Sequence, residues 1–385
     1  MHNPLISAER LQKATKVLFI AHLAIGDYQY LQTYFSAFAK QWPHLEIHLW
    51  VDEVRRTRFF WKWKHLQRYS LYDWLRASGI FTKIYDKTYS PGTYRSSMRQ
   101  ARAEGYPLVI SLATLRAHKY ALLASTIAPQ GYVVGVQKTT TIFQQYKRWC
   151  YRRLDAVLNL ATLPVDKKAH ITDAYALWFE RLVGLSVPPQ GRAPFINIPR
   201  EWIIAASLTL LKWGVSRKRP GAGKIVFINT FAKDSKRCWP LERAFELVRQ
   251  MQATPDYAFA YFIINTIPES YSQSVRLYRQ HSILNTHLFS AQQNFFQLPA
   301  MMSLCDVIVS VETAVIHLAS ALHKPVVALM RQKNPEWAPW QKSLSSIITT
   351  AQRVDWIKEI PAAQVKDTVL LFGREVGVGS SVTHQ

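Results

Sequence analysis

The sequence is poor in cysteine and lacks the motifs of several common enzyme classes. Its three cysteines lie far apart and form no CxxC pair or Cys/His cluster, so we expect neither a disulfide framework nor a zinc site. This pattern fits a reducing compartment. No GxGxxG fingerprint, Walker loop, GxSxG motif, HExxH motif or Asp-x-Asp pair occurs. The sequence therefore supports no dehydrogenase, P-loop ATPase, serine hydrolase or metalloprotease activity, and it predicts no metal site.

Long apolar runs are also missing. The N-terminal stretch MHNPLISAERLQKATK has no apolar core of the kind a secretory signal needs, so we expect no such signal. The longest apolar candidate, IIAASLTLLKW from Ile203, is too short to cross a bilayer. We therefore expect a cytoplasmic protein without a spanning segment.

Acidic residues are scarce relative to basic ones. The chain has 48 Lys and Arg against 25 Asp and Glu, for a formal charge of +23. Such an excess attracts nucleic acid, anionic lipid surfaces or highly anionic substrates, and charge alone does not choose among them.

Basic residues are most concentrated in VRRTRFFWKWKHLQRYSLYDW, residues 54–74, where they alternate with aromatic residues. This mixture suits a membrane interface or single-stranded nucleic acid. A helix with an aromatic core stripe and a solvated basic face explains it equally well. The candidates for an acceptor or membrane surface are Arg55, Arg56, Arg58, Lys62 and Lys64.

Apolar residues are abundant and indicate alternating strands and helices. At 385 residues and 49% hydrophobic composition, the chain is long enough for two domains. Segments 16–23 and 45–52 predict buried strands, and the helical pattern between them stops at Pro43. Further strands are predicted at FTKIYD, PLVISL and GYVVGV, and a basic helix at TIFQQYKRWCYRRLDAVLNL.

Composition changes around residues 184–224, where Pro-rich and Gly/Lys-rich stretches flank one probable helix, EWIIAASLTLLKW. A second α/β pattern starts with KIVFINTF. We predict a Rossmann-like N-terminal domain over 1–190, an interdomain linker over 191–223 and a Rossmann-like C-terminal domain with C-terminal helices over 224–385. The fold class is α/β, with the two domains facing across a cleft.

Polar residues gather at three corners where a strand passes into a helix, the position at which open α/β sheets bind ligands. In HLAIGDYQYL, Asp27 is placed to take a proton from a hydroxyl, or merely to cap the helix. In INTFAKDSKRCWPLERAF, a basic loop before a helix suits a phosphate, or is a solvated loop.

The third corner, SVETAVIHLASALHKPVV, opens a helix after Glu312. The first amides of that helix would point at an anion, and Thr313 could add a hydroxyl donor. His317 follows one turn later on the same side, although a lone His at such a position is more often a satisfied core residue.

The order and context of these corners resemble the ADP-heptose:lipopolysaccharide heptosyltransferases of glycosyltransferase family 9. IGDYQYL is similar to the family's Gly-Asp corner, and KDSKRCWPLERAFELV to its Lys/Arg-Trp-Pro loop. VSVETAVIHLASALHKPVVAL resembles its Asp-Thr-Gly corner followed by His-Leu-Ala. The resemblance spans roughly residues 16–50 and 224–332.

The resemblance implies the GT-B fold, with an acceptor-side first domain and a second domain that holds the donor. It implies inverting transfer of a heptose from ADP-heptose to the Kdo/heptose inner core of lipopolysaccharide or lipooligosaccharide, with no cofactor required. Asp27 would be the catalytic base. The residues implied to bind the donor are Thr230, Lys236, Arg237, Glu269, Glu312, Thr313, Ala314 and His317.

Three positions depart from the family pattern. Glu312 replaces the usual Asp and Ala314 the usual Gly, and the run Lys236-Arg237-Cys238-Trp239 offers two candidates for the phosphate contact. These departures bear on the donor's identity more than on the fold.

The family's acceptor also gives the basic surface an interpretation, as peripheral contact with the anionic cytoplasmic face of a bacterial inner membrane. Nucleic acid is then not an expected partner. Two alternatives remain: a family 9-like transferase with another donor or a protein acceptor, and a non-catalytic, basic nucleic-acid-binding α/β protein.

Overall fold

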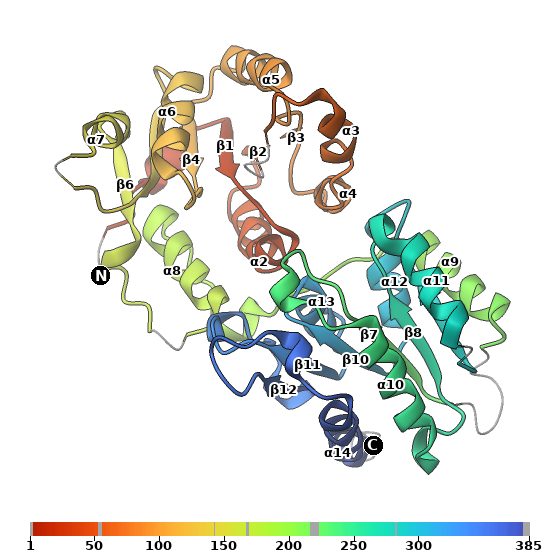
Figure 1. Ribbon diagram of the computed structural model, residues 1–385. Coiled ribbons are helices and arrows are strands. Elements are labelled where there is room, and N and C mark those ends of the chain that lie inside the picture. The colour runs from red at the N-terminus through yellow and green to blue at the C-terminus, as the bar shows by residue number, and fades with distance from the viewer. Residues whose placement is uncertain are drawn as a thin grey trace. The chain divides into compact units, whose positions relative to one another are not determined.

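The computed structural model describes residues 3–52, 56–141, 143–166, 169–215, 223–281 and 283–379. The chain divides into two compact units, Met1–Ala193 and Pro194–Gln385. Over the described residues, each unit contains one parallel sheet of six strands with helices packed on it (Figure 1). The prediction of two consecutive Rossmann-like α/β halves is confirmed.

The N-terminal unit arranges its strands in the order β3-β2-β1-β4-β5-β6, and all neighbours are parallel. The strands are β1 (Lys16–Ala21), β2 (Glu46–Val51), β3 (Lys83–Tyr85), β4 (Leu108–Ser111), β5 (Tyr132–Gln137) and β6 (Ala156–Asn159). The helices are α1 (Ala8–Lys13), α2 (Ile25–Gln41), α3 (Trp63–Leu66), α4 (Leu71–Ala77), α5 (Pro91–Ala103), α6 (Ala117–Ile127), α7 (Gln145–Tyr151) and α8 (Ile171–Val183).

The alternating side chains of β1 build a core on each face of this sheet. Leu18 and Ile20 join the cluster under α5 and α6. On the other face, the Phe19 ring meets Phe38 of α2 and Phe179 of α8 at centroid distances of 5.2 and 6.3 Å. Figure 1 shows these helix pairs on opposite sides of the sheet. Apolar residues on both faces explain why the central strands are continuous apolar runs rather than alternating ones.

The C-terminal unit has the equivalent strand order, β12-β11-β10-β7-β8-β9, with β7 in the place that β1 takes in the first unit. Its strands are β7 (Ile225–Asn229), β8 (Tyr261–Asn265), β9 (Thr286–Phe289), β10 (Val307–Val311), β11 (Val326–Met330) and β12 (Ser345–Thr349). Its helices are α9 (Arg200–Lys212), α10 (Leu241–Gln252), α11 (Tyr271–His281), α12 (Gln297–Ser303), α13 (Ala314–Ala321) and α14 (Ala362–Gly379).

Helix α9 lies inside the range 191–223, which was predicted as the interdomain linker. It packs against α12 and groups with the C-terminal unit, whose first residue is Pro194. None of the helices in the described ranges combines the length and apolarity needed to cross a bilayer.

The predicted helix over residues 141–160 is wrong in part. Among the described residues of this range, the α-helix spans residues 145–151, as α7, and residues 156–159 form the edge strand β6. The short apolar run AVLN has no periodicity that separates strand from helix. Long-range pairing makes this segment a strand. The Asp155 carboxylate accepts a hydrogen bond from the Val133 amide at 2.7 Å, and the residues that follow pair with β5. Strand β9 has no counterpart among the predicted segments.

One ion cluster joins the end of α5 to two strands. Glu104 accepts hydrogen bonds from the Lys16 and Lys83 ammonium groups at 2.8 and 2.6 Å. These two lysines lower the pKa of the Glu104 carboxyl to about 2. Because the folded-state pKa lies below the ordinary value, the cluster contributes stability at neutral pH and loses it as the pH falls toward that pKa.

We expect Glu104→Gln to lower the free energy of unfolding by up to about 1 kcal/mol near neutral pH, the usual size for ion pairs close to a surface. The difference from wild type should shrink as the pH falls below about 4 and the wild-type carboxyl protonates. Urea denaturation across this pH range measures it. Glu9→Gln is the matched control, because its pair with Lys13 is exposed on both sides. A Glu104→Gln effect that does not change with pH would contradict the assignment.

Candidate functional site

Each sheet has a topological switch point next to its central strand. In the N-terminal unit it lies between β1 and β4, and in the C-terminal unit between β7 and β10. Successive crossovers run in opposite directions from such a point, so open α/β sheets bind ligands at the strands' carboxyl ends there. Asp27 lies in the first turn of α2, the helix after β1; Asn229 ends β7, and Thr313 follows β10, so the predicted corners lie at these two positions.

Asp27 is held at the start of α2 from two sides. The helix has no polar side chain at its N-cap, Ala24, and the Asp27 Oδ2 accepts the Ala24 amide hydrogen bond at 3.0 Å instead. Its Oδ1 accepts a hydrogen bond from the Tyr175 hydroxyl of α8 at 3.1 Å. Burial raises the pKa of the Asp27 carboxyl, against the lowering effect of these hydrogen bonds. Asp27 therefore caps its helix, which is one of the two roles predicted for it. The residue is half-buried, and its carboxyl has a raised pKa.

His22 follows the same strand, and the sequence analysis missed it. Its Nε2 lies 3.4 Å from the Thr114 hydroxyl, at the end of the neighbouring strand β4. Its Nδ1 is buried with no hydrogen-bond partner among the described residues. Burial, followed by the charge of Lys138, lowers the pKa of His22 to about 4, so the ring is neutral near pH 7. Its only signal in the sequence is its place just after the apolar run of β1.

A small cavity of about 60 Å³ lies among charged residues of the N-terminal unit. The Arg56 guanidinium stands over the Tyr94 ring, 3.7 Å from its centroid. Arg116 occupies the N-cap of α6 with φ of 53°, a left-handed conformation that is uncommon for residues other than glycine. With Lys119, three cations here face one carboxylate, so the cavity suits an anion. It is lined by Asp52, Arg56, Tyr94, Arg116, Lys119 and Tyr120.

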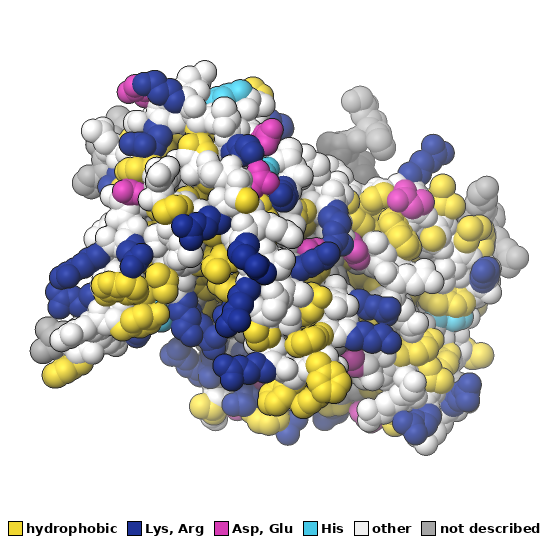
Figure 2. Space-filling view, turned by 90° about the horizontal axis from the view of Figure 1, so that it is seen from above, with side chains coloured by type: hydrophobic (Ala, Val, Ile, Leu, Met, Phe, Trp, Pro, Cys, Tyr) yellow, Lys and Arg dark blue, Asp and Glu magenta, His cyan; other side chains and the backbone are white. Residues whose placement is uncertain are grey.

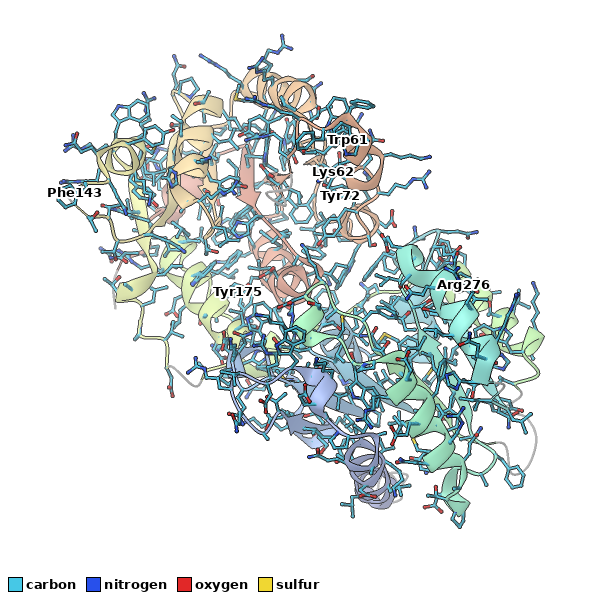
Figure 3. All side chains as sticks on the ribbon, viewed as in Figure 1. Trp61, Lys62, Tyr72, Phe143, Tyr175 and Arg276 are labelled. Carbon is cyan, nitrogen blue, oxygen red and sulfur yellow. The ribbon has the colours of Figure 1, made fainter. Side chains whose placement is uncertain are left out.

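Of the predicted acceptor-side cations, only Arg56 lines this cavity. Arg58, Lys62 and Lys64 are exposed, and Arg55 lies outside the described residues. The rings between them also face solvent rather than the core, with Phe59, Phe60 and Trp61 exposed by 52%, 70% and 62%. Figure 3 labels Trp61 and Lys62 at this edge of the unit. The alternative of an aromatic core stripe therefore does not describe residues 59–61.

In the C-terminal unit, Asn229 links three strands. Its Nδ2 donates to the Ser310 and Thr313 hydroxyls, each at 3.1 Å, and its Oδ1 accepts from the Asn265 amide at 2.8 Å. Thr313 is the N-cap of α13, and its hydroxyl accepts from the Val315 amide at 3.3 Å. This network fixes the start of α13 relative to β7 and β8, where the first helix amides form a positive end.

The next residue, Thr230, is buried but unsatisfied. It is 1% exposed, and its hydroxyl has no hydrogen-bond partner among the described residues. Its carbonyl accepts from the Trp239 amide at 2.9 Å, which closes the basic loop between them. A buried hydroxyl without a partner is costly, so such a group is a candidate for a ligand or water contact.

The structure separates the two basic candidates of that loop. One Arg237 nitrogen, Nη1, lies 3.4 Å from the Glu312 carbonyl and 3.7 Å from its carboxylate, beside the start of α13. The Lys236 ammonium lies instead 5.9 Å from the centre of the Trp356 ring. Arg237 is therefore the cation that the fold brings to the third corner.

Glu312 organises this corner from within. It is 5% exposed, and its Oε2 accepts from the Arg331 amide at 3.3 Å. Its Oε1 accepts from the Asn334 side chain at 3.1 Å and faces Arg237. The carboxylate thus ties the end of β10 to the end of β11 and to the basic loop.

The remaining predicted residues differ in their exposure. His317 is 6% exposed, and its ring lies 5.6 Å from the Trp337 ring. Ala314 is the first residue of α13. Glu269 is exposed on a 3₁₀ turn, Pro268–Ser270, that follows β8.

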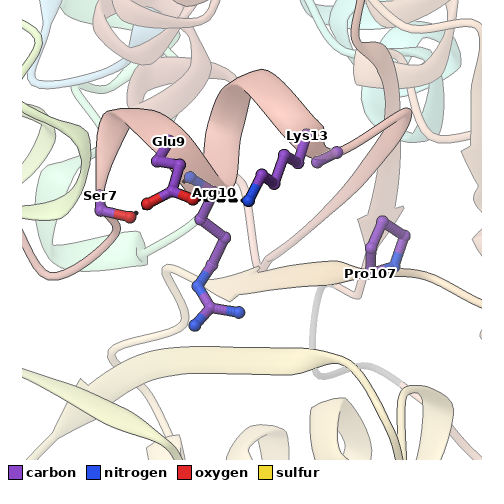
Figure 4. Close-up of a pocket in the computed structure, with 6 residues that line it drawn as sticks. Ser7, Glu9, Arg10, Lys13 and Pro107 are labelled. Carbon is purple, nitrogen blue, oxygen red and sulfur yellow. Dashed lines mark hydrogen bonds and ion pairs between the residues drawn. The ribbon is translucent and has the colours of Figure 1, made fainter.

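A different cavity, of about 310 Å³, lies at the opposite, amino end of the first sheet, between α1 and Pro107 (Figure 4). Its charges are already engaged: Lys13 pairs with Glu9 at 2.5 Å, and Arg10 stands 3.9 Å from the centre of the Tyr132 ring. In the part of the chain that the structure describes, no group of three or more His, Cys, Asp or Glu side chains could hold a metal ion.

Comparison with known proteins matches both the sequence and the fold. Residues 205–359 match the family model of glycosyltransferase family 9 (heptosyltransferase). None of the curated proteins compared matches the sequence.

Solved structures match almost the whole chain. A family 9 glycosyltransferase from Veillonella parvula aligns with a TM-score of 0.68 and 14% identity, over 94% of this chain and 98% of that one. E. coli ADP-heptose LPS heptosyltransferase II gives 0.64 and 16% identity, over 93% and 98%. E. coli heptosyltransferase WaaC with ADP gives 0.61 and 14%, over 93% and 99%. At these identities the likeness shows the fold, which is GT-B.

Asn229 and Thr230 give a matched pair for testing which polar groups hold the corner together. We expect Asn229→Ala to lower the free energy of unfolding by about 2–3 kcal/mol. The substitution removes the hydrogen-bond partner of the buried Asn265 side-chain amide and of the Ser310 and Thr313 hydroxyls. Thr230→Val replaces an unpaired hydroxyl with a methyl group and should change stability by less than about 0.5 kcal/mol. Urea denaturation measures both. Equal losses would show that the Thr230 hydroxyl has a partner in the folded protein.

Proposed function

We propose that this chain, a glycosyltransferase of GT-B fold, moves a heptose from ADP-heptose to the inner core of lipopolysaccharide or lipooligosaccharide. Its residues 205–359 match the model of glycosyltransferase family 9. The observation that carries this proposal is the corner after β10. There Arg237, the start of α13 and the unpaired Thr230 hydroxyl gather at one switch point.

The chemistry of this corner fits a nucleoside diphosphate. The first amides of α13 and the helix dipole favour an anion. Arg237 adds a planar cation, and of its five N–H donors only those of Nη1 are directed at Glu312, so others are left for phosphate oxygens. In the transfer, the diphosphate leaves with its charge developing on oxygen, and these donors stabilise that charge without a metal.

Two further residues complete the proposed donor site. Glu269 follows β8, the strand beside β7, and its exposed carboxylate is suited to accept hydrogen bonds from ribose hydroxyls. His317 acts from within the corner, where it packs near Trp337 and supports the first turn of α13.

Asp27 is the proposed general base. The acceptor hydroxyl gives its proton to the Asp27 carboxylate while its oxygen attacks the anomeric carbon, and the bond from that carbon to the diphosphate oxygen breaks with inversion. Burial raises the pKa of Asp27 toward the operating pH, which strengthens it as a base. Tyr175 fixes the carboxylate through its 3.1 Å hydrogen bond and acts as a positioning residue.

The N-terminal unit carries the features suited to the acceptor. The inner core of lipopolysaccharide bears carboxylate and phosphate groups. The cavity that Arg56, Arg116 and Lys119 line has the size and charge for one such group. The exposed rings of residues 59–61 and the adjacent Arg58, Lys62 and Lys64 support peripheral contact with the anionic cytoplasmic face of the inner membrane.

Calorimetric titration with ADP tests the donor assignment. We expect Arg237→Ala to weaken ADP binding by about 10- to 100-fold, the loss of one charge-assisted contact, and Lys236→Ala by less than about 3-fold. Thr230→Val should weaken binding without lowering stability. UDP and GDP serve as controls. Preference for another nucleotide would change the donor, and no binding by any of the three would remove the basis of the proposal.

Kinetics test the base. We expect Asp27→Asn to lower kcat by about 10²- to 10⁴-fold while the ADP affinity stays at the wild-type value. The Tyr175 hydrogen bond lowers the pKa of Asp27, so Tyr175→Phe should raise it. Because the reaction needs the ionised carboxylate, the acidic limb of the rate profile should then move to higher pH. A Tyr175→Phe profile that matches wild type would exclude Asp27 as the titrating group.

A further inference from the structure

A second aromatic and basic surface lies on α7, well away from residues 59–61. Its aromatic members are Phe143, Tyr146 and Trp149, which are exposed by 90%, 56% and 45%. Tyr146 and Trp149 are three residues apart and so lie on one face of the helix, while the neighbouring Cys150 and Tyr151 are buried. Exposure of three large rings within seven residues differs from the scattered apolar residues of an ordinary surface.

Two of the rings, Tyr146 and Trp149, contact each other, and Tyr146 also contacts α6. Tyr146 and Trp149 stack at a centroid distance of 6.0 Å, and His118 of α6 meets Tyr146 edge-on at the same distance. The Arg153 guanidinium stands over Trp149, 4.2 Å from the ring centre. These contacts hold the Tyr146 and Trp149 rings in place before any partner arrives, which lowers the entropy cost of binding.

Positive charge surrounds these rings. Lys147, Arg148 and Arg153 come from α7 and the turn after it, and the chain holds no acidic residue between Glu104 and Asp155. Arg116 and Lys119 of α6 lie close enough, with Lys147, to lower the pKa of His118, although burial is the larger cause. Figure 2 shows Lys and Arg side chains around hydrophobic ones at the left of this face, over α7.

Three acidic residues of this unit have other partners or line another cavity. Asp155 accepts the Val133 amide hydrogen bond, and Asp52 lines the separate cavity together with Arg116 and Lys119. Glu104 is paired with two lysines at the amino end of the sheet. Within the described residues, no carboxylate forms an ion pair with Lys147, Arg148 or Arg153.

We propose that the α7 surface, consisting of Phe143, Tyr146, Lys147, Arg148, Trp149 and Arg153, docks on anionic lipid headgroups. Tyr and Trp rings favour the headgroup level of a bilayer, where one end stays wet, and each nearby Lys or Arg contributes about 1 kcal/mol at an anionic surface. The choice of lipid rests on the proposed function, because a lipid-linked acceptor brings the enzyme to a membrane.

Single-stranded nucleic acid is the competing partner for aromatic and basic residues. Bases bind by stacking on open ring faces. Here Trp149 already contacts both Tyr146 and Arg153, which leaves less free face for a base. The arrangement thus favours a lipid surface.

The surface is separate from the exposed rings of residues 59–61. Figure 3 places Phe143 and Trp61 far apart on the same unit, with both side chains at its outside. Two separated contacts on one folded unit restrict its rotation on a membrane and add avidity.

Vesicle co-sedimentation of the full chain tests the proposal, with phosphatidylcholine vesicles compared with vesicles that also contain phosphatidylglycerol. Wild type should bind only the anionic vesicles. Lys147→Ser with Arg148→Ser should weaken that binding by about 10- to 30-fold, and Phe143→Ser with Trp149→Ser by at least about 10-fold. All four side chains are at least partly exposed, so the variants should fold, as thermal unfolding verifies.

Matched controls lie on the C-terminal unit. Leu208→Ser removes an apolar side chain that is 52% exposed on α9. Arg276→Ser with Arg279→Ser removes two exposed charges from α11, where Figure 3 labels Arg276. Both controls should bind vesicles within about 2-fold of wild type. If the α7 variants bind like these controls, the proposal is overturned.

Two further measurements separate the outcomes. If the α7 variants lose binding to a single-stranded oligonucleotide but keep vesicle binding, the surface takes nucleic acid and the proposal fails. ADP titration of the same variants should match wild type. If the α7 variants lose vesicle binding but the wild type does not bind ADP, the α7 surface is upheld and the proposed function fails. If the wild type binds ADP but the α7 variants bind vesicles normally, the proposed function stands and the α7 proposal fails.

Discussion

A parallel sheet must be covered on both faces, and this constraint organises each half of the molecule. The chain meets it by winding outward from a central strand in one direction and then returning to wind in the other, which produces the order β3-β2-β1-β4-β5-β6 and its equivalent in the second unit. The reversal beside β1 and beside β7 creates the two switch points. Asp27, Asn229 and Thr313 are positioned by strand ends or helix starts that follow from this winding.

The two switch points are filled with different chemistry. The first holds Asp27, whose carboxyl has a raised pKa, and a neutral His22. The second holds Arg237, a helix start and the Asn229 network, which together favour an anion. In the proposed transfer, the carboxylate at one position would take the proton of the acceptor, and the positive groups at the other would stabilise the departing diphosphate.

At Glu312 the third corner departs from the family 9 pattern that it resembles, and the structure gives this residue a physical role. A carboxylate buried without partners would be costly, and Glu312 has three: the Arg331 amide, the Asn334 side chain and Arg237. The side chain therefore neutralises part of the Arg237 charge and at the same time holds that guanidinium beside α13. The corner remains cationic because the helix end adds its own positive potential.

The N-terminal unit combines its catalytic candidate with unpaired positive charge. The cavity lined by Arg56, Arg116 and Lys119, the exposed segment 56–64 and the α7 surface all lie on this unit. The net charge of +23 destabilises the folded state through repulsion between like charges, and it attracts anionic ligands and surfaces. The charge agrees with the proposed anionic acceptor at an anionic surface.

The sequence by itself determined the α/β class, most strands, α9 and the three polar corners, because apolar periodicity and turn residues are local signals. It did not determine that β6 is a strand or that Arg237, rather than Lys236, lies beside Glu312. It also did not reveal that Tyr175 contacts Asp27 or that Arg116 lines a cavity. Asp27 and Tyr175 lie 148 residues apart, and Arg237 and Glu312 lie 75 apart. Such contacts depend on which strands become neighbours and on how the basic loop closes. Only the tertiary structure decided them, since long-range pairing leaves no trace in local periodicity.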